Sequence, residues 1–258
     1  MLREKQGRVL LVGAGPGAAD LLTLRAVRAI KRADVVLADA LVGKDVRALI
    51  PRRTRIIEVG KRGHLPSTSQ DFINQLMVRL ARTGSTVVRL KGGDPCIFGR
   101  VAEEQRFIED AGVPVEVIPG VTSASAAAAE FGFSLTTRAG ARRVLFATGR
   151  TLTGAAVDWS AASDSQTTLC LYMGCADIAE IASGLIAAGR EPTTPAIAAI
   201  SISRPDSRLV SSTLSAIAAD IAGEPAGDPV LIAIGEACTD AITRAAVLAP
   251  RLQDQKAC

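Results

Sequence analysis

The stretch RVLLVGAGPG at residues 8–17 decides the fold, because a continuous apolar run leads directly into a glycine-rich turn. An apolar run without alternation is typical of a strand buried on both faces, as in a parallel sheet. Apolar residues then recur at helical spacing from Leu21 to Ile30, and Asp20 can cap the helix that they predict. The segment therefore predicts a strand, a loop and a helix, which together open an α/β fold.

Strand and helix patterns alternate through the first half of the chain. Further strands are predicted at 34–39, 55–59, 86–90 and 114–120, with helices that open at Ser69 or Asp71 and at 122–130. This alternation implies a mainly parallel sheet with right-handed crossovers.

A polar, glycine-containing connector at 132–142 separates the two halves. The second half has strand patterns near 143–148, 167–172, 196–202, 208–212 and 229–234, and helix patterns near 176–188 and 213–222. Some of these strands are expected to be antiparallel. We predict two α/β domains, residues 1–135 and 136–258.

The composition is that of a globular protein with a core of small and aliphatic side chains. Of 258 residues, 48% are hydrophobic and 22% are charged, but only 3% are aromatic. The net charge of +4 comes from basic residues that are scattered along the chain. Nucleic-acid-binding surfaces usually cluster basic and aromatic residues, so the composition argues against a nucleic-acid partner and favours a small polyanionic substrate.

The cysteines and the histidine give no pattern for a metal site or a disulfide framework. The five cysteines are Cys96, Cys170, Cys175, Cys238 and Cys258. No pair has CxxC spacing, and His64 is the single histidine, so we expect free thiols in a reducing compartment and no bound metal. The sequence begins without an apolar leader and lacks the roughly 20 apolar residues of a membrane span, which predicts a cytoplasmic protein without membrane contact.

Two glycine-rich loops follow predicted strands, GAGPG at 13–17 and KGGDP at 91–95. Ligands of open α/β sheets bind beyond the carboxyl ends of strands, so both loops are candidate binding sites. GAGPG with Asp39 at the end of the next strand favours a nicotinamide cofactor, but the GxGxG spacing and the missing amide hydrogen of Pro16 argue against one. The adjacent glycines of KGGDP fit a ligand contact or an ordinary turn, and spacing does not decide between them.

Longer matches indicate a family. They are GAGPG followed by DLLTLRAVRAIKRADVVLADALV, then VGKR at 59–62, VRLKGGDPCIFGR at 88–100, PVEVIPGVTSASAAAA at 114–129 and YMG at 172–174. In these segments and their order the chain resembles the uroporphyrinogen-III C-methyltransferases, which are class III S-adenosylmethionine-dependent tetrapyrrole methyltransferases. The resemblance runs from about residue 8 to about residue 236.

The resemblance implies a fold, a cofactor and a set of site residues. It implies two α/β domains of the tetrapyrrole methylase type with the cofactor in the cleft between them, and a homodimer. The implied cofactor is S-adenosylmethionine, with S-adenosylhomocysteine as its product and no metal. The residues implied to bind it are Pro16, Gly92, Gly93, Asp94, Ile97, Thr122, Ser123, Met173 and Ile202. Those implied to act on the tetrapyrrole are Asp39, Lys61 and Met173.

The reaction that the resemblance implies is methylation of uroporphyrinogen III at C2 and C7, which gives precorrin-2 by way of precorrin-1 on the route to sirohaem and cobalamin. In it, the Asp39 carboxylate suits stabilising a cationic pyrrole and taking up its proton, and Lys61 suits binding substrate carboxylates. The alternatives are a class III enzyme acting on a later precorrin, a nicotinamide-dependent oxidoreductase and a regulatory binding module. Without the family resemblance, each of these residues also has an ordinary structural interpretation. Asp39 could cap a turn, Lys61 could be a solvated surface charge, and Met173 could fill the core.

The sequence departs from the family pattern at a few positions. Cys96 stands where Phe is usual, Ser123 where Ala is usual, and Ile202 where glycine is usual. We expect Ile202 to contact the cofactor through its backbone. Because the residues implied to act on the tetrapyrrole match the family, an active enzyme is expected.

Overall fold

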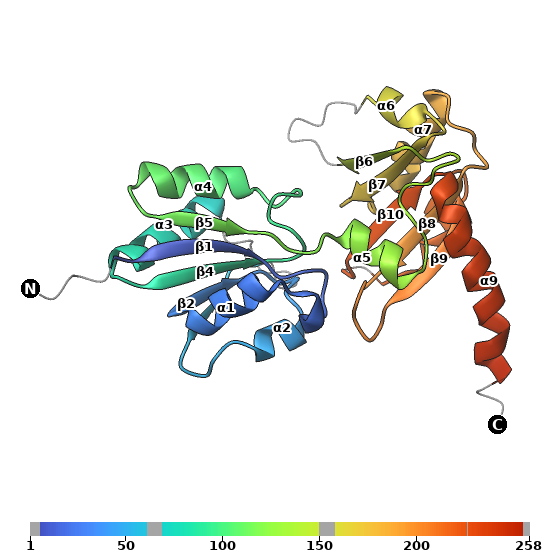
Figure 1. Cartoon of the computed structure of the whole chain (residues 1–258). Helices are drawn as coiled ribbons and strands as arrows, with labels where there is room; N and C mark the ends of the chain where they lie inside the picture. Colours follow the sequence, from blue (N-terminus) through green and yellow to red (C-terminus); the bar gives the residue numbers. More distant parts are fainter. Residues whose placement is uncertain (1–5, 61–68, 150–157, 226, 255–258) are drawn as a thin grey trace, which may run out of the picture. The chain divides into compact units, whose positions relative to one another are not determined.

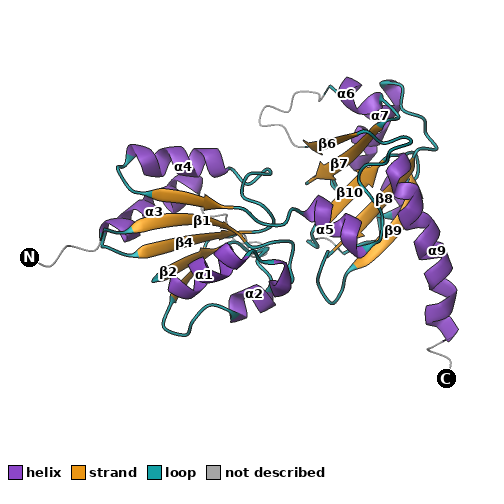
Figure 2. Cartoon of the chain, in the orientation of Figure 1, coloured by secondary structure: helices purple, strands orange, loops and turns teal. Residues whose placement is uncertain are grey.

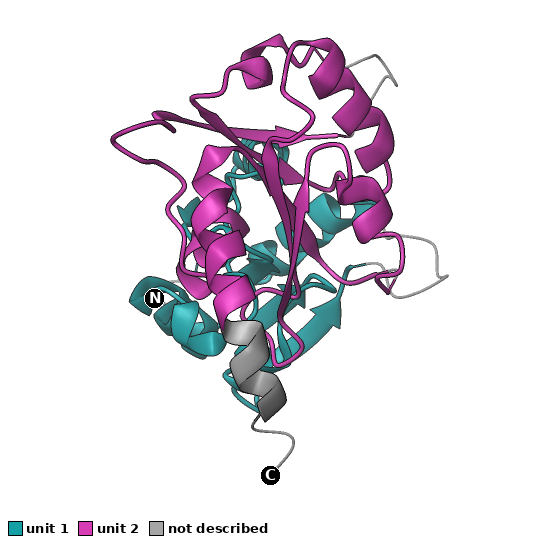
Figure 3. Ribbon diagram, turned by 90° about the vertical axis from the view of Figure 1, so that its right-hand side faces the viewer, with its two compact units in different colours: residues 1–122 teal, residues 123–258 magenta. Residues whose placement is uncertain are grey.

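The apolar run that opens the sequence forms the first strand of a parallel sheet, β1 (Arg8–Gly13). The computed structural model of the chain describes residues 6–60, 69–149, 158–225 and 227–254. The chain divides into two compact units, residues 1–122 and residues 123–258, which are coloured separately in Figure 3. Each unit has its own sheet (Figure 2) and also its own hydrophobic core.

The first unit alternates strands and helices, as the sequence predicts. After β1 its elements are α1 (Leu24–Arg32), β2 (Val35–Ala38), α2 (Lys44–Ala48), β3 (Arg55–Glu58), α3 (Gln70–Arg82), β4 (Thr86–Lys91), α4 (Val101–Asp110) and β5 (Val115–Ile118). The strands lie in the order β3-β2-β4-β1-β5, and every neighbouring pair is parallel. All the carboxyl ends of these strands therefore lie at one edge of the sheet.

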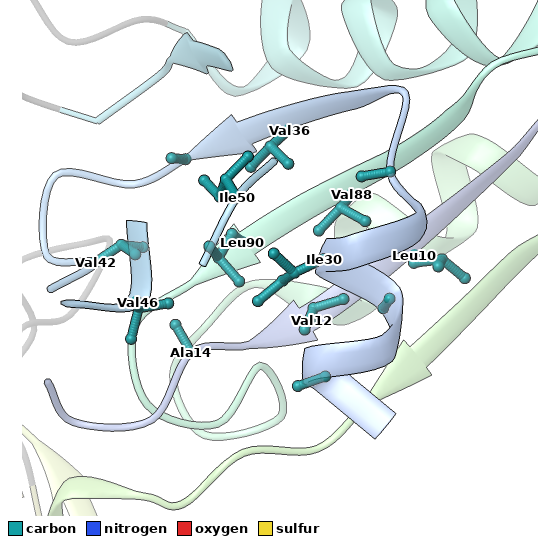
Figure 4. Close-up of a cluster of buried hydrophobic side chains, with 14 of the residues drawn as sticks. Leu10, Val12, Ala14, Ile30, Val36, Val42, Val46, Ile50, Val88 and Leu90 are labelled. Carbon is teal, nitrogen blue, oxygen red and sulfur yellow. The ribbon is translucent and has the colours of Figure 1, made fainter. Parts of the chain in front are cut away.

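Helices cover both faces of this sheet (Figure 1). On one face, Val12 and Leu90 pack against Ile30 of α1 in a cluster of buried aliphatic side chains (Figure 4). On the other face, Leu11 lies in a cluster with Met77 of α3 and Ile108 of α4. Because both faces are covered, the loops at the strand ends are where a ligand can approach the sheet.

The starts of two helices test the capping predictions. Thr23 caps α1, because its hydroxyl accepts a hydrogen bond from the Ala26 amide at 3.1 Å. The prediction that Asp20 caps this helix is wrong, since Asp20 lies in a short 3₁₀ turn before it. Ser69, one of the two predicted starts, caps α3.

The second unit is built on a mixed sheet. Its elements are α5 (Ser123–Glu130), β6 (Arg143–Thr148), α6 (Ser160–Ser163), β7 (Thr167–Tyr172), α7 (Ile178–Ala187), β8 (Pro195–Ile200), β9 (Arg208–Thr213), α8 (Ile217–Asp220), β10 (Val230–Ile234) and α9 (Thr239–Asp254). The strand order is β6-β7-β10-β8-β9, in which only the β6–β7 pair is parallel. The antiparallel strands agree with the sequence prediction, but the helix predicted at 213–222 is shorter because β9 extends into its start.

The division between the units lies earlier than the predicted boundary at 135/136. It falls between Thr122 and Ser123, directly before α5. The alanine-rich face of α5 has its partners in the second unit, where Ala128 is buried in a cluster with Ala233 of β10. The polar connector at 132–142 is where the sequence predicted the boundary. The boundary lies earlier because α5, which precedes the connector, packs in the second unit.

Three further observations concern the side chains that the structure describes. Cys96 and Cys175 are exposed free thiols, and Cys170 and Cys238 are buried ones. Among the described residues no group of three or more His, Cys, Asp or Glu side chains is placed to hold a metal ion. In the same residues, no helix combines the length and the apolar character needed to cross a membrane.

Candidate functional site

Three loops meet at the carboxyl edge of the first unit's sheet. KGGDP follows β4, GAGPG follows β1 and PGVT at 119–122 follows β5, and these three strands are neighbours. The Gly15 amide donates to the Gly93 carbonyl at 3.2 Å, and the Gly93 amide donates to the Gly15 carbonyl at 2.7 Å. The two glycine-rich loops that the sequence indicates are therefore joined by a short antiparallel bridge.

The glycines of these loops serve two different purposes. A Cβ on Gly13 would lie 2.6 Å from the Gly120 amide nitrogen, and one on Gly120 would lie 2.3 Å from the Gly93 carbonyl oxygen. Backbone packed on backbone thus requires glycine at 13 and 120. Gly93 differs, because it has a φ of +65° and a Cβ there would meet no described atom within 4 Å. The space beside Gly93 fits the close approach of a cofactor to the backbone.

Asp94 ties the KGGDP loop to the loop after β5. Its Oδ1 accepts a hydrogen bond from the Cys96 amide at 2.7 Å, and its Oδ2 accepts one from the Gly120 amide at 2.9 Å. Hydrogen bonds to a carboxylate are stronger than those between neutral groups. Asp94 therefore fixes the shape of the loops in addition to any contact that it makes with a ligand.

Asp39 lies at the same edge, where it follows β2 beside β4. Its amide donates to the Leu90 carbonyl at 3.1 Å, and its Oδ1 accepts a hydrogen bond from Arg89 Nη2 at 2.6 Å. The Asp39 side chain is 28% exposed, whereas that of Arg89 is 4% exposed. The turn that follows Asp39 lies close to KGGDP, since a Cβ on Gly92 would be 3.3 Å from the Cβ of Leu41 in that turn. Asp39 is thus an accessible carboxylate next to the KGGDP loop, and its partner is buried.

Three buried charged residues behind Asp39 are missed by the sequence reasoning. Arg89 and Lys91 belong to β4, and Glu104 belongs to α4. Glu104 accepts from Arg89 Nε at 3.3 Å and from Lys91 Nζ at 2.9 Å. Burial lowers the pKa of Lys91, and the charge of Glu104 acts in the opposite direction. The available signal was the pair of basic residues at alternate positions in VVRLK, an otherwise apolar strand.

The predicted cofactor contacts of the second unit gather at one edge of its sheet. Met173 and Ile202 come after β7 and β8, which both pair antiparallel with β10 and therefore end on the same side. Ser123 begins α5 next to them, because the Ala124 amide donates a hydrogen bond to Tyr172 Oη at 3.3 Å. The mixed sheet thus presents three of the predicted residues together.

Met173 and Ile202 present different atoms. Met173 is 48% exposed and has a φ of +53°, which is unusual for a residue with a side chain and is often found at functional sites. Its exposure argues against the core-packing interpretation. Ile202 is 5% exposed and lies between Ser201 and Ser203, which both have positive φ. Ile202 is therefore buried as a whole residue, and the expected contact of its backbone with the cofactor stays a prediction.

The first unit brings the remaining predicted residues to one edge of its sheet. They are Pro16, Asp39, Gly92, Gly93, Asp94, Ile97 and Thr122. The last predicted residue, Lys61, lies outside the described residues, as does His64.

Known proteins resemble this chain along most of its length. Residues 8–218 match the family Tetrapyrrole (Corrin/Porphyrin) Methylases. A uroporphyrinogen-III C-methyltransferase of Pseudomonas aeruginosa is 42% identical over 92% of the chain and 97% of that protein. Siroheme synthase 1 of Klebsiella pneumoniae is 47% identical over 82% of the chain, which spans only 45% of that relative. A crystal structure of uroporphyrin-III C-methyl transferase from Thermus thermophilus, complexed with S-adenyl homocysteine, matches with 40% identity and a TM-score of 0.78 over 90% of the chain and 99% of that structure.

Proposed function

Because the chain belongs to the tetrapyrrole (corrin/porphyrin) methylase family, we propose that it methylates uroporphyrinogen III at C2 and C7 with S-adenosylmethionine, giving precorrin-2 by way of precorrin-1. The observation that carries this proposal is an accessible carboxylate, Asp39, beside a loop with open space at Gly93. The product would feed the synthesis of sirohaem, cobalamin or both.

The loops of the first unit are suited to hold the cofactor. S-adenosylmethionine, when bound, would supply a methyl group that an electron-rich substrate carbon can attack, while the carbon–sulfur bond breaks and S-adenosylhomocysteine leaves. We assign its binding to the KGGDP loop through Gly92, Gly93, Asp94 and Ile97, and to Pro16 and Thr122 nearby. Ser123, Met173 and the backbone of Ile202 are proposed as contacts from the second unit. Residues that orient the reactants in this way can lower a barrier by about 7–11 kcal/mol.

Asp39 is proposed to act on the substrate. A pyrrole carbon that gains a methyl group carries positive charge until it loses a proton, and a nearby carboxylate stabilises that charge and accepts the proton. The exposure of the Asp39 side chain is what allows it to meet a substrate. Lys61 remains a predicted partner for substrate carboxylates, and Met173 a predicted contact in the same site.

The proposal is tested by the mass of the product. Purified protein, uroporphyrinogen III and S-adenosylmethionine, mixed without oxygen, should give a product that is heavier by two methyl groups. Asp39→Asn should lower kcat by about a hundredfold or more, because the base of a proton transfer is lost. It should leave the affinity for S-adenosylhomocysteine unchanged. No methylated product from the wild-type protein, or methylation of precorrin-2 alone, would show that the substrate is wrong.

We also propose that the protein works as a homodimer, as the family resemblance implies, and that it is located in the cytoplasm. Light scattering on the purified protein should give twice the chain mass of 26.7 kDa. A mass of one chain at micromolar concentration would contradict the dimer, and fractionation of cells would test the location.

A further inference from the structure

Strand β4 places two cations inside the first unit. Arg89 and Lys91 are 3% and 4% exposed, although the buried strand residues around them on that side of the sheet, such as Leu11, Leu37 and Val87, are aliphatic. Residues at alternate positions of a strand point to the same face, so both share the face of Val87, which α3 and α4 cover. A buried charge is strongly unfavourable unless it is paired and hydrogen-bonded. Each cation therefore needs a partner in the interior.

Glu104 is the partner that both cations share. It is fully buried, and its Oε1 accepts from Arg89 Nε at 3.3 Å while its Oε2 accepts from Lys91 Nζ at 2.9 Å. Gln70 Nε2, at the start of α3, also donates to Oε1 at 3.0 Å. Both oxygens of this carboxylate are thus engaged, so the position of Glu104 is fixed by β4 and α3 as well as by its own helix.

Asp39 completes the charge balance and forms the accessible end of this network. Two cations facing Glu104 alone would leave one positive charge uncompensated, and Arg89 Nη2 meets Asp39 Oδ1 at 2.6 Å. Arg89 therefore donates from Nε toward the buried Glu104 and from Nη2 toward the exposed edge. A guanidinium is planar and rigid, so bonds from two of its nitrogens fix its orientation. Through its Nη2 hydrogen bond, Arg89 in this fixed orientation also holds the Asp39 carboxylate in place.

Resting on the proposed function, in which Asp39 acts on the substrate, we propose that Arg89 is a positioning residue that Glu104 holds from behind and that fixes the Asp39 carboxylate for reaction. Arg89 does not itself meet the substrate, because its side chain is buried. A displacement of about 1 Å in a reacting group can cost about a hundredfold in rate. The alternative is that Arg89 only stabilises the fold, in which case it acts independently of Asp39.

A double-mutant cycle separates these two roles. The kcat for methylation of uroporphyrinogen III is measured for the wild type, Arg89→Met, Asp39→Asn and the double variant. We expect Arg89→Met alone to lower kcat by about a hundredfold with little change in KM, whereas in the Asp39→Asn background it lowers kcat by less than about threefold. Equal losses in both backgrounds, or an unchanged kcat for Arg89→Met, would overturn the proposal.

Arg190→Met is the matched control. Arg190 is another buried arginine, but it donates to the carbonyls of Ala162, Asp164 and Thr167 in the second unit, none of which belongs to the proposed site. Arg190→Met should keep kcat within about threefold of the wild type, and a loss as large as that of Arg89→Met would show that the loss of a buried charge, not positioning, matters. If Arg89→Met does not fold, Arg89→Lys takes its place in the cycle, because an ammonium keeps the charge but cannot hold Glu104 and Asp39 in the same planar geometry.

Failure of this inference is distinct from failure of the proposed function. If the wild type makes no methylated product, the proposed function fails and this inference fails with it. If Asp39→Asn keeps full activity, the proposed function stands, but the role of Asp39 and this inference fail. If the wild type is active and Asp39→Asn is much less active, additive losses in the cycle refute the role of Arg89 alone.

Discussion

Substitution of Gly93 by alanine gives the sharpest test of the cofactor site. The added methyl group would meet no described atom within 4 Å, so none of the described residues opposes it sterically. The backbone does, because Gly93 has a φ of +65° and a left-handed conformation costs an alanine about 1–2 kcal/mol. We therefore expect Gly93→Ala to fold, with a free energy of unfolding lowered by about that amount.

Gly93→Ala should also weaken binding of the cofactor, beyond what its loss of stability alone would cause. If the cofactor lies against the backbone at Gly93, the methyl group occupies space that the ligand needs. We expect the Kd for S-adenosylhomocysteine, measured by titration calorimetry, to rise at least about tenfold, which corresponds to about 1.4 kcal/mol.

Gly112→Ala provides a matched control. Gly112 has a φ of +72° and also has no described atom within 4 Å of a Cβ, but it follows α4 and precedes β5, at the opposite end of the sheet from the loops. Urea unfolding should give similar losses of stability for both variants, while only Gly93→Ala loses affinity. Unchanged affinity in Gly93→Ala, or equal loss of affinity in Gly112→Ala, would refute the assignment of KGGDP to the cofactor.

Three other predictions follow from the loops and the thiols. Asp94→Asn replaces one acceptor by a donor that faces a backbone amide, so it should cost about 1–3 kcal/mol in urea unfolding and weaken binding of S-adenosylhomocysteine; unchanged values would show that Asp94 does not hold the loops. Burial raises the pKa of the Cys170 thiol from 9.0 to about 12, so its stabilising contribution is complete below pH 9 and is lost as the pH rises toward 12. Wild-type protein should lose about 1.4 kcal/mol more than Cys170→Ala between pH 8 and pH 10, and parallel curves would contradict this. A thiol reagent should label Cys96 and Cys175 in the native protein but Cys170 and Cys238 only after unfolding, as mass spectrometry of the labelled peptides would check.

Local patterns predict the strands of the first unit because a strand that is buried on both faces must be apolar throughout. The run at 8–12 and the run at 86–90 are both strands, and the loops after them carry the candidate site. Choosing between two nearby cap residues needs more than pattern. Asp20 and Thr23 are both good caps, and Thr23 is the one at which the helix begins.

Contacts between distant residues lie beyond local patterns. The Asp39–Arg89 pair joins residues 50 positions apart, and the Asp94–Gly120 hydrogen bond joins residues 26 positions apart. A basic residue in a buried strand indicates that a partner exists, but the sequence does not say which carboxylate it is. Likewise, the alanine-rich helix at 123–130 could pack on either neighbour, so its place in the second unit required the tertiary structure.

The junction of the three loops has a consequence for engineering. Gly13 and Gly120 meet through backbone atoms, so any side chain there would force the loops apart before it could touch a ligand. A library intended to make the protein accept altered cofactors should therefore leave both positions unchanged. Substitutions are better placed at Pro16 and Ile97, which are partly exposed and lie outside the close backbone contact of Gly13 with Gly120. Within the same loops, some positions can therefore be substituted and others, such as Gly13 and Gly120, must remain glycine.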